Sequence, residues 1–361
     1  MRGLFICTLA TPVRLALNRP HKGTESINTQ KSTSDPASTQ HFRAVRMLAL
    51  TTIFWSLSFP LVKSLGILQA KLIPGVNTWF NAGLTGFMRF GIAALVMILI
   101  ARNTLPRLTR SEIYEGLGLG FFAGGGIILQ TDGLGHTTAS ISAFITQAFC
   151  IFVPIIVAFR DRTLPGIRLF VAVLIMVLGI GILSNFNPAT FHLGRGEAET
   201  LLAAVFFAGQ ILWLERPIFS GNNPLNFSFV MFLAMSLLSA PIAMATWNSP
   251  RDVITCYSNG GIIVITLALV FFCTIIAFVE MNKWQPFVPA TEAAIIYGAE
   301  PVFASVFALF LPAIISRFTG IDYANETITI RLLLGGILII AANLLLQWRW
   351  KKRGNTASTP Q

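Results

Sequence analysis

Long apolar runs alternate with short polar segments over most of the chain. A helix needs about 20 apolar residues to cross a bilayer. Segments with turn-forming residues, such as "DGLG", "RDRTLPG" and "SGNNP", separate the runs. The pattern predicts an all-α integral membrane protein with ten transmembrane helices, at 47–68, 78–101, 113–131, 137–158, 167–184, 199–215, 226–246, 260–281, 290–311 and 331–349.

Composition agrees with a protein that is embedded in a lipid bilayer. Of the 361 residues, 54% are hydrophobic and only 11% are charged, whereas soluble domains carry about 25% charged residues. The net charge of +11 would suggest nucleic-acid binding in a soluble protein. Here the basic residues lie in short segments between apolar runs, so we expect no nucleic-acid partner.

The basic residues also predict the orientation of the helices. If both termini are cytoplasmic, the inner segments hold 19 of the 26 Lys and Arg residues and the outer loops hold five. Cytoplasmic loops of membrane proteins are enriched in Lys and Arg. We therefore expect cytoplasmic N- and C-termini, an even number of spans, and localisation to a bacterial inner (plasma) membrane.

The two ends of the chain differ from the apolar body. Residues 1–46 contain the Ser/Thr/Gln-rich tract "TESINTQKSTSDPASTQ", a composition that cannot bury a core. A disordered cytosolic tail is the main interpretation, a targeting segment or a true start at Met47 being the alternatives. Residues 351–361 form a basic cytoplasmic tail.

Internal similarity indicates that the body is a duplication. "ASISAFITQAFCIFVPIIVAF" (139–159) aligns with "ATEAAIIYGAEPVFASVFALF" (290–310) at an offset of 151, and "FWSLSFPLVK" (54–63) aligns with "FAGQILWLER" (207–216) at 153. The expected five-helix repeats are 47–184 and 199–350, joined by an external linker at 185–198. Because five is odd, the second repeat must be inverted, as in secondary transporters that bind substrate between the halves.

Several of these stretches resemble a known family. "FWSLSFPLVK", "MRFGIAALVMILIAR", "TTASISAFITQAFCIFVPII" and above all "WQPFVPATEAAIIYGAEPVFASVFALF" are similar to EamA-type members of the drug/metabolite transporter (DMT) superfamily. The resemblance covers roughly residues 47–350 and implies a ten-helix bundle that exports or exchanges small metabolites without a cofactor. The chain departs from the family in its longer external connection, "LPAIISRFTGIDYANETITIR", which has no assigned role.

Two charged residues lie near the middle of predicted spans. Arg89 is in the second span and Glu300 in the ninth. Charges inside a membrane normally face the bundle interior or a water-filled cavity and have partners. One interpretation is a buried Arg–carboxylate pair, and the other is a pathway for substrate or protons.

Four uncharged residues are weaker candidates for lining a substrate cavity. Gln147 and Gln210 lie at helix depth, where interhelical hydrogen bonding is the alternative role. Trp55 and Trp213 lie inside the first helix of each repeat rather than at the membrane interface, and core filling is their alternative role.

Prolines predict bends in the fourth and ninth spans, at Pro154 and Pro301. Pro301 has no N–H group, so the carbonyl of Tyr297 lacks its helical donor. A freed carbonyl is tolerated in a membrane where a neighbour or cavity water satisfies it. Glu300 aligns with Phe149 of the first repeat, so only one repeat carries the ionisable group.

A glycine stripe marks the third span. Gly116, Gly120 and Gly124 share one helix face in "GLGLGFFAGGG", and small residues at this spacing allow a neighbouring helix to approach closely. The same stretch matches a dinucleotide-binding pattern only formally, because that motif requires a strand before it.

Together these features predict a secondary active transporter, an exporter or exchanger of a small organic metabolite that works by alternating access. Protons are the candidate coupling ion, and a homodimer is a candidate assembly. We expect no enzymatic activity, cofactor or metal, since the four cysteines show no ligand spacing and no metalloprotease or serine-hydrolase motif is present. The alternative is an intramembrane enzyme or a channel-like membrane protein without transport activity.

Overall fold

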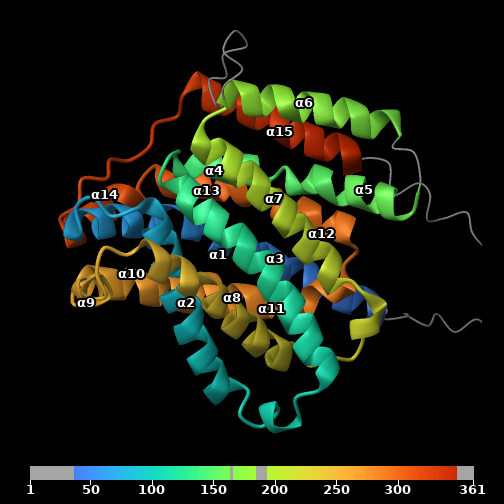
Figure 1. The fold of residues 1–361 in the computed structure, drawn as a ribbon. Coiled ribbons are helices and arrows are strands. Elements are labelled where there is room, and N and C mark those ends of the chain that lie inside the picture. Colours follow the sequence, from blue (N-terminus) through green and yellow to red (C-terminus); the bar gives the residue numbers. More distant parts are fainter. Residues whose placement is uncertain (1–35, 163–165, 184–192, 348–361) are drawn as a thin grey trace, which may run out of the picture.

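A computed structural model describes residues 36–162, 166–183 and 193–347, and within these ranges the chain is a bundle of helices (Figure 1). The N-terminal part comprises α1 (Pro36–Leu72), α2 (Thr78–Ile100), η1 (Leu105–Arg107), α3 (Arg110–Leu134), α4 (Ala139–Thr146), α5 (Phe149–Arg160) and α6 (Ile167–Leu183). The C-terminal part comprises α7 (Arg195–Leu214), η2 (Pro217–Phe219), α8 (Pro224–Thr246), α9 (Arg251–Tyr257), α10 (Gly260–Val270), the π-helical η3 (Phe271–Ile276), α11 (Ala277–Trp284), η4 (Gln285–Phe287), α12 (Ala290–Tyr297), α13 (Glu300–Ala308), α14 (Leu311–Thr319) and α15 (Ile330–Gln347).

Helix occupies each of the ten apolar runs expected from the sequence. In the described ranges, seven helical stretches are long and apolar enough to cross a membrane, or eight if α13 and α14, which meet at 48°, form one bent span. Two further apolar helices, Ile167–Leu183 and Ile330–Leu346, are shorter. The all-helical membrane class is therefore confirmed, while crossing by all ten runs stays a prediction.

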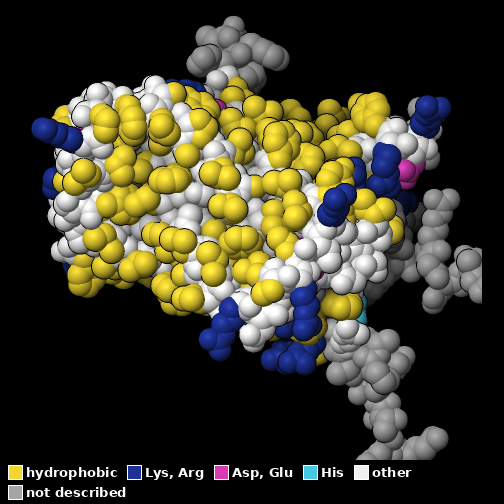
Figure 2. Space-filling model, turned by 60° about the horizontal axis from the view of Figure 1, so that its bottom comes forward, with side chains coloured by type: hydrophobic (Ala, Val, Ile, Leu, Met, Phe, Trp, Pro, Cys, Tyr) yellow, Lys and Arg dark blue, Asp and Glu magenta, His cyan; other side chains and the backbone are white. Residues whose placement is uncertain are grey.

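The surface of the bundle suits contact with lipid. Large apolar side chains such as Leu95, Leu99 and Phe121 are more than half exposed. Figure 2 shows such side chains spread over one broad face, with Lys and Arg gathered towards its ends. An exposed apolar area of this extent is costly in water and favourable in a bilayer.

The packing places α3 in the middle of the bundle, against both α7 and α8. Helix α2 runs along α8, and α6 lies beside α15 at the top of Figure 1. Helix α1 contacts α10, α11, α12 and α13. The long helices of the N-terminal part thus pack mainly on helices of the C-terminal part.

The glycine stripe of α3 lies at its contact with α8. A Cβ atom added to Gly120 would be 2.5 Å from the Cβ of Ala234, and one added to Gly116 would be 2.7 Å from the carbonyl oxygen of Phe227. At Gly124 the nearest atom, Cδ2 of Leu238, would be 3.1 Å away. The first two positions leave no room for a side chain.

Helix α1 begins at Pro36, so the last residues of the expected tail 1–46 are helical. Ala44 and Leu48 are fully buried, His41 Nε2 lies 3.1 Å from Glu292 Oε2, and the guanidinium of Arg43 lies 5.5 Å from the ring centre of Trp284. These contacts hold the last residues of the segment 1–46 against the bundle, although composition alone assigned that segment to a tail. Residues 1–35 and 351–361 lie outside the described residues, as does most of the 185–198 linker, whose end belongs to α7.

The fourth and ninth apolar runs are both interrupted. Helix α4 ends before Gln147 and Ala148, and α5 follows; α12 ends before Gly298 and Ala299, and α13 follows. Each of the two runs is therefore divided into two shorter helices, called half-helices here, although Ala139–Arg160 still forms one apolar stretch of 22 residues.

The two prolines lie at different places relative to the interruptions. Pro301 lies in the first turn of α13, where the missing N–H costs little because that position has no helical acceptor. Pro154 lies inside α5, so the interruption at Gln147–Ala148 precedes it. A bend at Pro154 stays a prediction.

The connection between α13 and α15, which contains α14, contacts the start of α4. Helix α14 ends at Gly320, whose φ of +68° is left-handed and suits glycine. The Glu326 carboxylate then accepts hydrogen bonds from the backbone N–H groups of Ala139 (2.8 Å) and Ser140 (3.3 Å). These are free N–H groups at the start of α4, so the connection caps α4.

Candidate functional site

A cavity opens where the interrupted helices face the rest of the bundle. The empty space, including open solvent at its mouth, is about 570 Å³. Its wall is mostly aromatic and aliphatic with a few polar groups, and α1, α2, α3, α4, α5, α7, α11, α12 and α13 all contribute to it. The lining residues are Trp55, Ser58, Arg89, Ile127, Gln130, Thr146, Phe149, Phe207, Gln210, Ile211, Phe278, Met281, Tyr297 and Glu300.

The two helix interruptions are joined by Gln147. Its side-chain Nε2 donates to the carbonyl oxygen of Tyr297 (3.2 Å) and to Oε2 of Glu300 (3.3 Å). The hydroxyl of Ser56 donates to the backbone oxygen of Glu300 (2.8 Å). The carbonyl that Pro301 leaves without a helical donor is thus satisfied by a neighbouring half-helix. Gln147 is fully buried and lies one hydrogen bond behind the cavity wall.

Arg89 is held by the π-helical segment η3. Its Nε donates to Oγ1 of Thr274 (2.6 Å), and its Nη2 donates to the carbonyl oxygen of Cys273 (2.8 Å). A π-helix shifts the backbone hydrogen bonds by one residue and often occurs at functional sites. Here it presents a carbonyl and a hydroxyl to a guanidinium that is 3% exposed.

The ion pair between Arg89 and Glu300, one of the two interpretations of these charges, is not found among the described residues. Among the described residues, none of the ion pairs includes either side chain. The carbonyl and hydroxyl of η3 satisfy the guanidinium instead, while Glu300 contacts Gln147. A fixed cation and a carboxyl group therefore line one cavity without neutralising each other.

The aromatic wall contains an unused donor. The indole Nε1 of Trp55 is buried and has no hydrogen-bond partner, although a buried donor normally has one. The Trp55 ring lies 5.2 Å from that of Phe278 and 5.4 Å from that of Tyr297. The Tyr297 hydroxyl in turn donates to Oε1 of Gln285 (3.0 Å). Nε2 of Gln285 is also buried without a partner among the described residues, but Trp55 is the one of the two that lines the cavity.

Of the two remaining candidates from the sequence analysis, one lies elsewhere and the other lines the cavity. Trp213 does not line the cavity: its Nε1 donates to the carbonyl oxygen of Glu115 (3.2 Å), and the guanidinium of Arg216 lies 4.0 Å from its ring centre. Gln210 does line the cavity, where its Nε2 lies 3.7 Å from the sulfur of Met281. Trp55 and Trp213, which lie in the first helices of the two proposed repeats, therefore have different surroundings.

Other cavity residues escaped the sequence analysis. Gln130, which donates to Oγ1 of Thr146 (2.9 Å), is a polar residue inside an apolar run and could have been found by the signal that marked Gln147. Phe207 and Phe278 carry no such signal, because the chain contains 30 phenylalanines. Among the described residues, no three His, Cys, Asp or Glu side chains converge as metal ligands.

Comparison with known proteins identifies a relative by sequence and a solved structure with a similar fold. No family model matches the chain. A protein of Archaeoglobus fulgidus described as an uncharacterized transporter is 28% identical over 303 residues, which is 84% of this chain and 85% of that protein. A protein of known crystal structure matches with a TM-score of 0.51 and 16% identity over 85% of this chain and 97% of its own. The chain is thus similar over most of its length to a transporter, and its fold has a solved counterpart.

Proposed function

We propose that the protein is a secondary active transporter of the EamA type, which exports or exchanges a small organic metabolite by alternating access. The observation that carries the proposal is the cavity at the meeting point of two interrupted helices, with Glu300 and Arg89 in its wall. Interrupted helices near midplane are the usual site of substrate and coupling-ion binding in secondary transporters. The similarity to a transporter from Archaeoglobus fulgidus supports the same class.

The positions of the interruptions support an inverted repeat of five helices. Gln147–Ala148 and Gly298–Ala299 differ by 151 residues, the offset at which the two sequence segments align. At this offset Thr146 corresponds to Tyr297, and Phe149 corresponds to Glu300. All four of these residues line the cavity.

The helix packing supports the same symmetry. In a ten-span chain α2 and α8 are the second helix of each repeat, and α6 and α15 are the fifth. Each of these pairs packs together. Likewise α3 packs on α7, as α11 packs on α1. An axis that relates the two repeats would therefore pass close to the cavity.

The cavity chemistry favours an organic substrate that has both apolar and polar parts. Aromatic side chains offer apolar contact, while Arg89, Glu300 and the free indole N–H of Trp55 offer a charge of each sign and a donor. A gradient must drive transport in this proposal, and protons are the candidate because Glu300 can change its charge.

Flux through reconstituted protein tests the proposal. An untargeted metabolite comparison of deletion and overexpression cells supplies the candidates, which are then labelled and offered to proteoliposomes. We expect saturable uptake that is accelerated by unlabelled substrate on the opposite side. In alternating access, a cavity that is loaded with substrate reorients across the membrane faster than an empty one. Uptake without this acceleration would indicate a channel, and chemical conversion of the compound would indicate an enzyme.

The ten-span topology has a separate test. A reporter that is active only outside the cytoplasm is fused either after Gln361 or in the connection near Ile321. We expect it to be silent at the first position and active at the second, since the basic segments predict cytoplasmic termini. An active reporter after Gln361 with a silent one near Ile321 would refute the orientation.

A further inference from the structure

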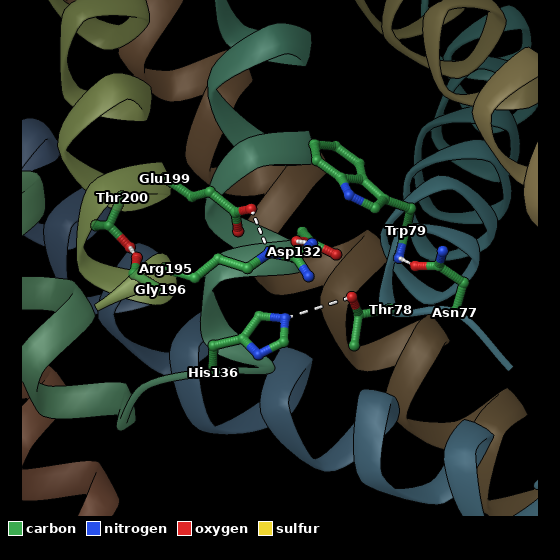
Figure 3. Close-up of polar contacts among 9 residues, drawn as sticks. All are labelled: Asn77, Thr78, Trp79, Asp132, His136, Arg195, Gly196, Glu199 and Thr200. Carbon is green, nitrogen blue, oxygen red and sulfur yellow. Dashed lines mark hydrogen bonds and ion pairs between the residues drawn. The ribbon is translucent and has the colours of Figure 1, made fainter. Parts of the chain in front are cut away.

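A second cluster of charged groups lies apart from the cavity, where the end of α3 meets the start of α7 (Figure 3). Nη2 of Arg195 donates to Oδ2 of Asp132, and its Nε donates to Oε1 of Glu199 (2.8 Å). The Asp132 side chain is fully buried and that of Glu199 is 15% exposed, whereas Arg195 is about half exposed. One guanidinium thus serves two carboxyl groups, one from each helix.

The end of α3 and the start of α7 are packed too closely for a layer of water to separate these charges. A Cβ atom added to Gly196 would be 2.6 Å from the carbonyl oxygen of Gly133, and one added to Gly133 would be 2.9 Å from the carbonyl oxygen of Gly196. The hydroxyl of Thr200 donates to that same Gly196 oxygen (2.7 Å). Backbone contact fixes the two carboxyl groups in place, so they cannot move apart while the junction is closed.

Each carboxyl group has one oxygen without a partner. Oδ1 of Asp132 and Oε2 of Glu199 are buried and accept no hydrogen bond from the described residues. Both carboxyl groups bind the same guanidinium, through its Nε and Nη2 atoms, so they lie close to each other. Two carboxylates that face one guanidinium in a site largely closed to water repel each other, and one shared proton removes the repulsion. The proton also turns one free acceptor into the donor that the other needs.

The surrounding charged groups have other contacts. Oε1 of Glu197 accepts from Oγ1 of Thr137 (2.8 Å), and Nε2 of His136 lies 3.4 Å from Oγ1 of Thr78. The ammonium of Lys63 donates to the carbonyl oxygens of Leu134 (3.0 Å) and Thr137. With two acids and one arginine, the cluster carries an excess negative charge that a single proton cancels. A metal ion would be repelled by the guanidinium that already occupies both carboxyl groups.

We propose that Asp132 and Glu199 bind one proton between them, and that this proton fastens α3 to α7. Without it the buried excess charge weakens the junction, so opening of the junction and release of the proton are linked. Under the proposed function this junction lies at the outer end of the bundle and joins the two repeats. A low external pH then favours its closed state. The proton site itself does not depend on transport activity.

Unfolding of the purified full-length chain across neutral pH tests the site. If the folded state holds one more proton than the unfolded state, stability falls as pH rises. The unfolding equilibrium constant of the wild type should then rise by up to about tenfold more per pH unit than that of Glu199→Gln. Glutamine keeps an N–H donor towards Asp132 and cannot titrate. Glu197→Gln, which removes an acid two residues away that bonds Thr137, should keep the wild-type slope.

Infrared spectroscopy provides the second readout. The carbonyl stretch of a protonated carboxyl group should weaken in Glu199→Gln and in Asp132→Asn, and remain in Glu197→Gln; Asp132→Asn also replaces Glu199→Gln if the latter folds poorly. Equal pH slopes in wild type and Glu199→Gln, with an unchanged carboxyl band, would overturn the proposal. So would stabilisation of the wild type by sodium rather than by protons, measured against choline at constant pH.

Discussion

Glu300→Gln is expected to reduce uptake driven by a pH gradient to the level of protein-free liposomes, while the protein still folds and inserts. Glutamine preserves the size of the side chain and an oxygen that can accept from Nε2 of Gln147. The bond from Ser56 goes to the backbone oxygen of residue 300 and is unaffected. What the substitution removes is the ability to gain and lose a proton. Because Glu300 lines the cavity and is 7% exposed, we expect exchange between compartments of equal pH to persist.

The matched control is Glu292→Gln. Glu292 lies on the preceding half-helix α12, and its side chain is 41% exposed and contacts His41 rather than the cavity. This variant should transport at the wild-type rate. Since Arg89 and Glu300 form no ion pair, the stability losses of Arg89→Gln and Glu300→Gln should also add in the double variant. Wild-type gradient-driven uptake by Glu300→Gln would show that the carboxyl group is only a structural contact.

Gly120→Leu is expected to cause the largest loss of folded protein. A Cβ atom at this position would be 2.5 Å from the Cβ of Ala234 and 3.0 Å from the carbonyl oxygen of Met231, so α3 and α8 must move apart. Overpacking a well-packed contact costs about 1–3 kcal/mol, and a leucine against backbone exceeds that range. The measurement is the monodisperse fraction after solubilisation, together with the melting temperature.

Gly66→Leu is the control that distinguishes the effect of crowding from the effect of helix propensity. Gly66 lies in α1, and a Cβ atom added there would meet nothing within 4 Å. Both substitutions gain about 1 kcal/mol of helix propensity over glycine, so Gly66→Leu should keep or improve the yield. A normal yield and melting temperature for Gly120→Leu would mean that α8 does not pack on this face of α3.

The sequence by itself determined the class of the protein and the positions of its helices. Both depend on local properties: an apolar run of sufficient length must satisfy its own backbone hydrogen bonds in lipid, and a helix does so within one segment. The same local logic singled out Arg89 and Glu300 as charges in apolar surroundings, and it identified the carbonyl freed by Pro301. The alignment of the sequence with itself showed the offset of 151 residues. In the structure, the break between α4 and α5 and the break between α12 and α13 lie at the same offset.

Only the tertiary structure decided which groups meet. Arg89 bonds the π-helix η3 rather than Glu300, because a carbonyl and a hydroxyl from a distant helix reach it. Of the two tryptophans, Trp55 in α1 lines the cavity and Trp213 in α7 does not, because Arg216 and α3 enclose Trp213. Nothing in the spacing of Asp132 and Glu199 indicates that they share a site. Their proximity comes from the close contact of Gly133 with Gly196, which joins segments far apart in the chain.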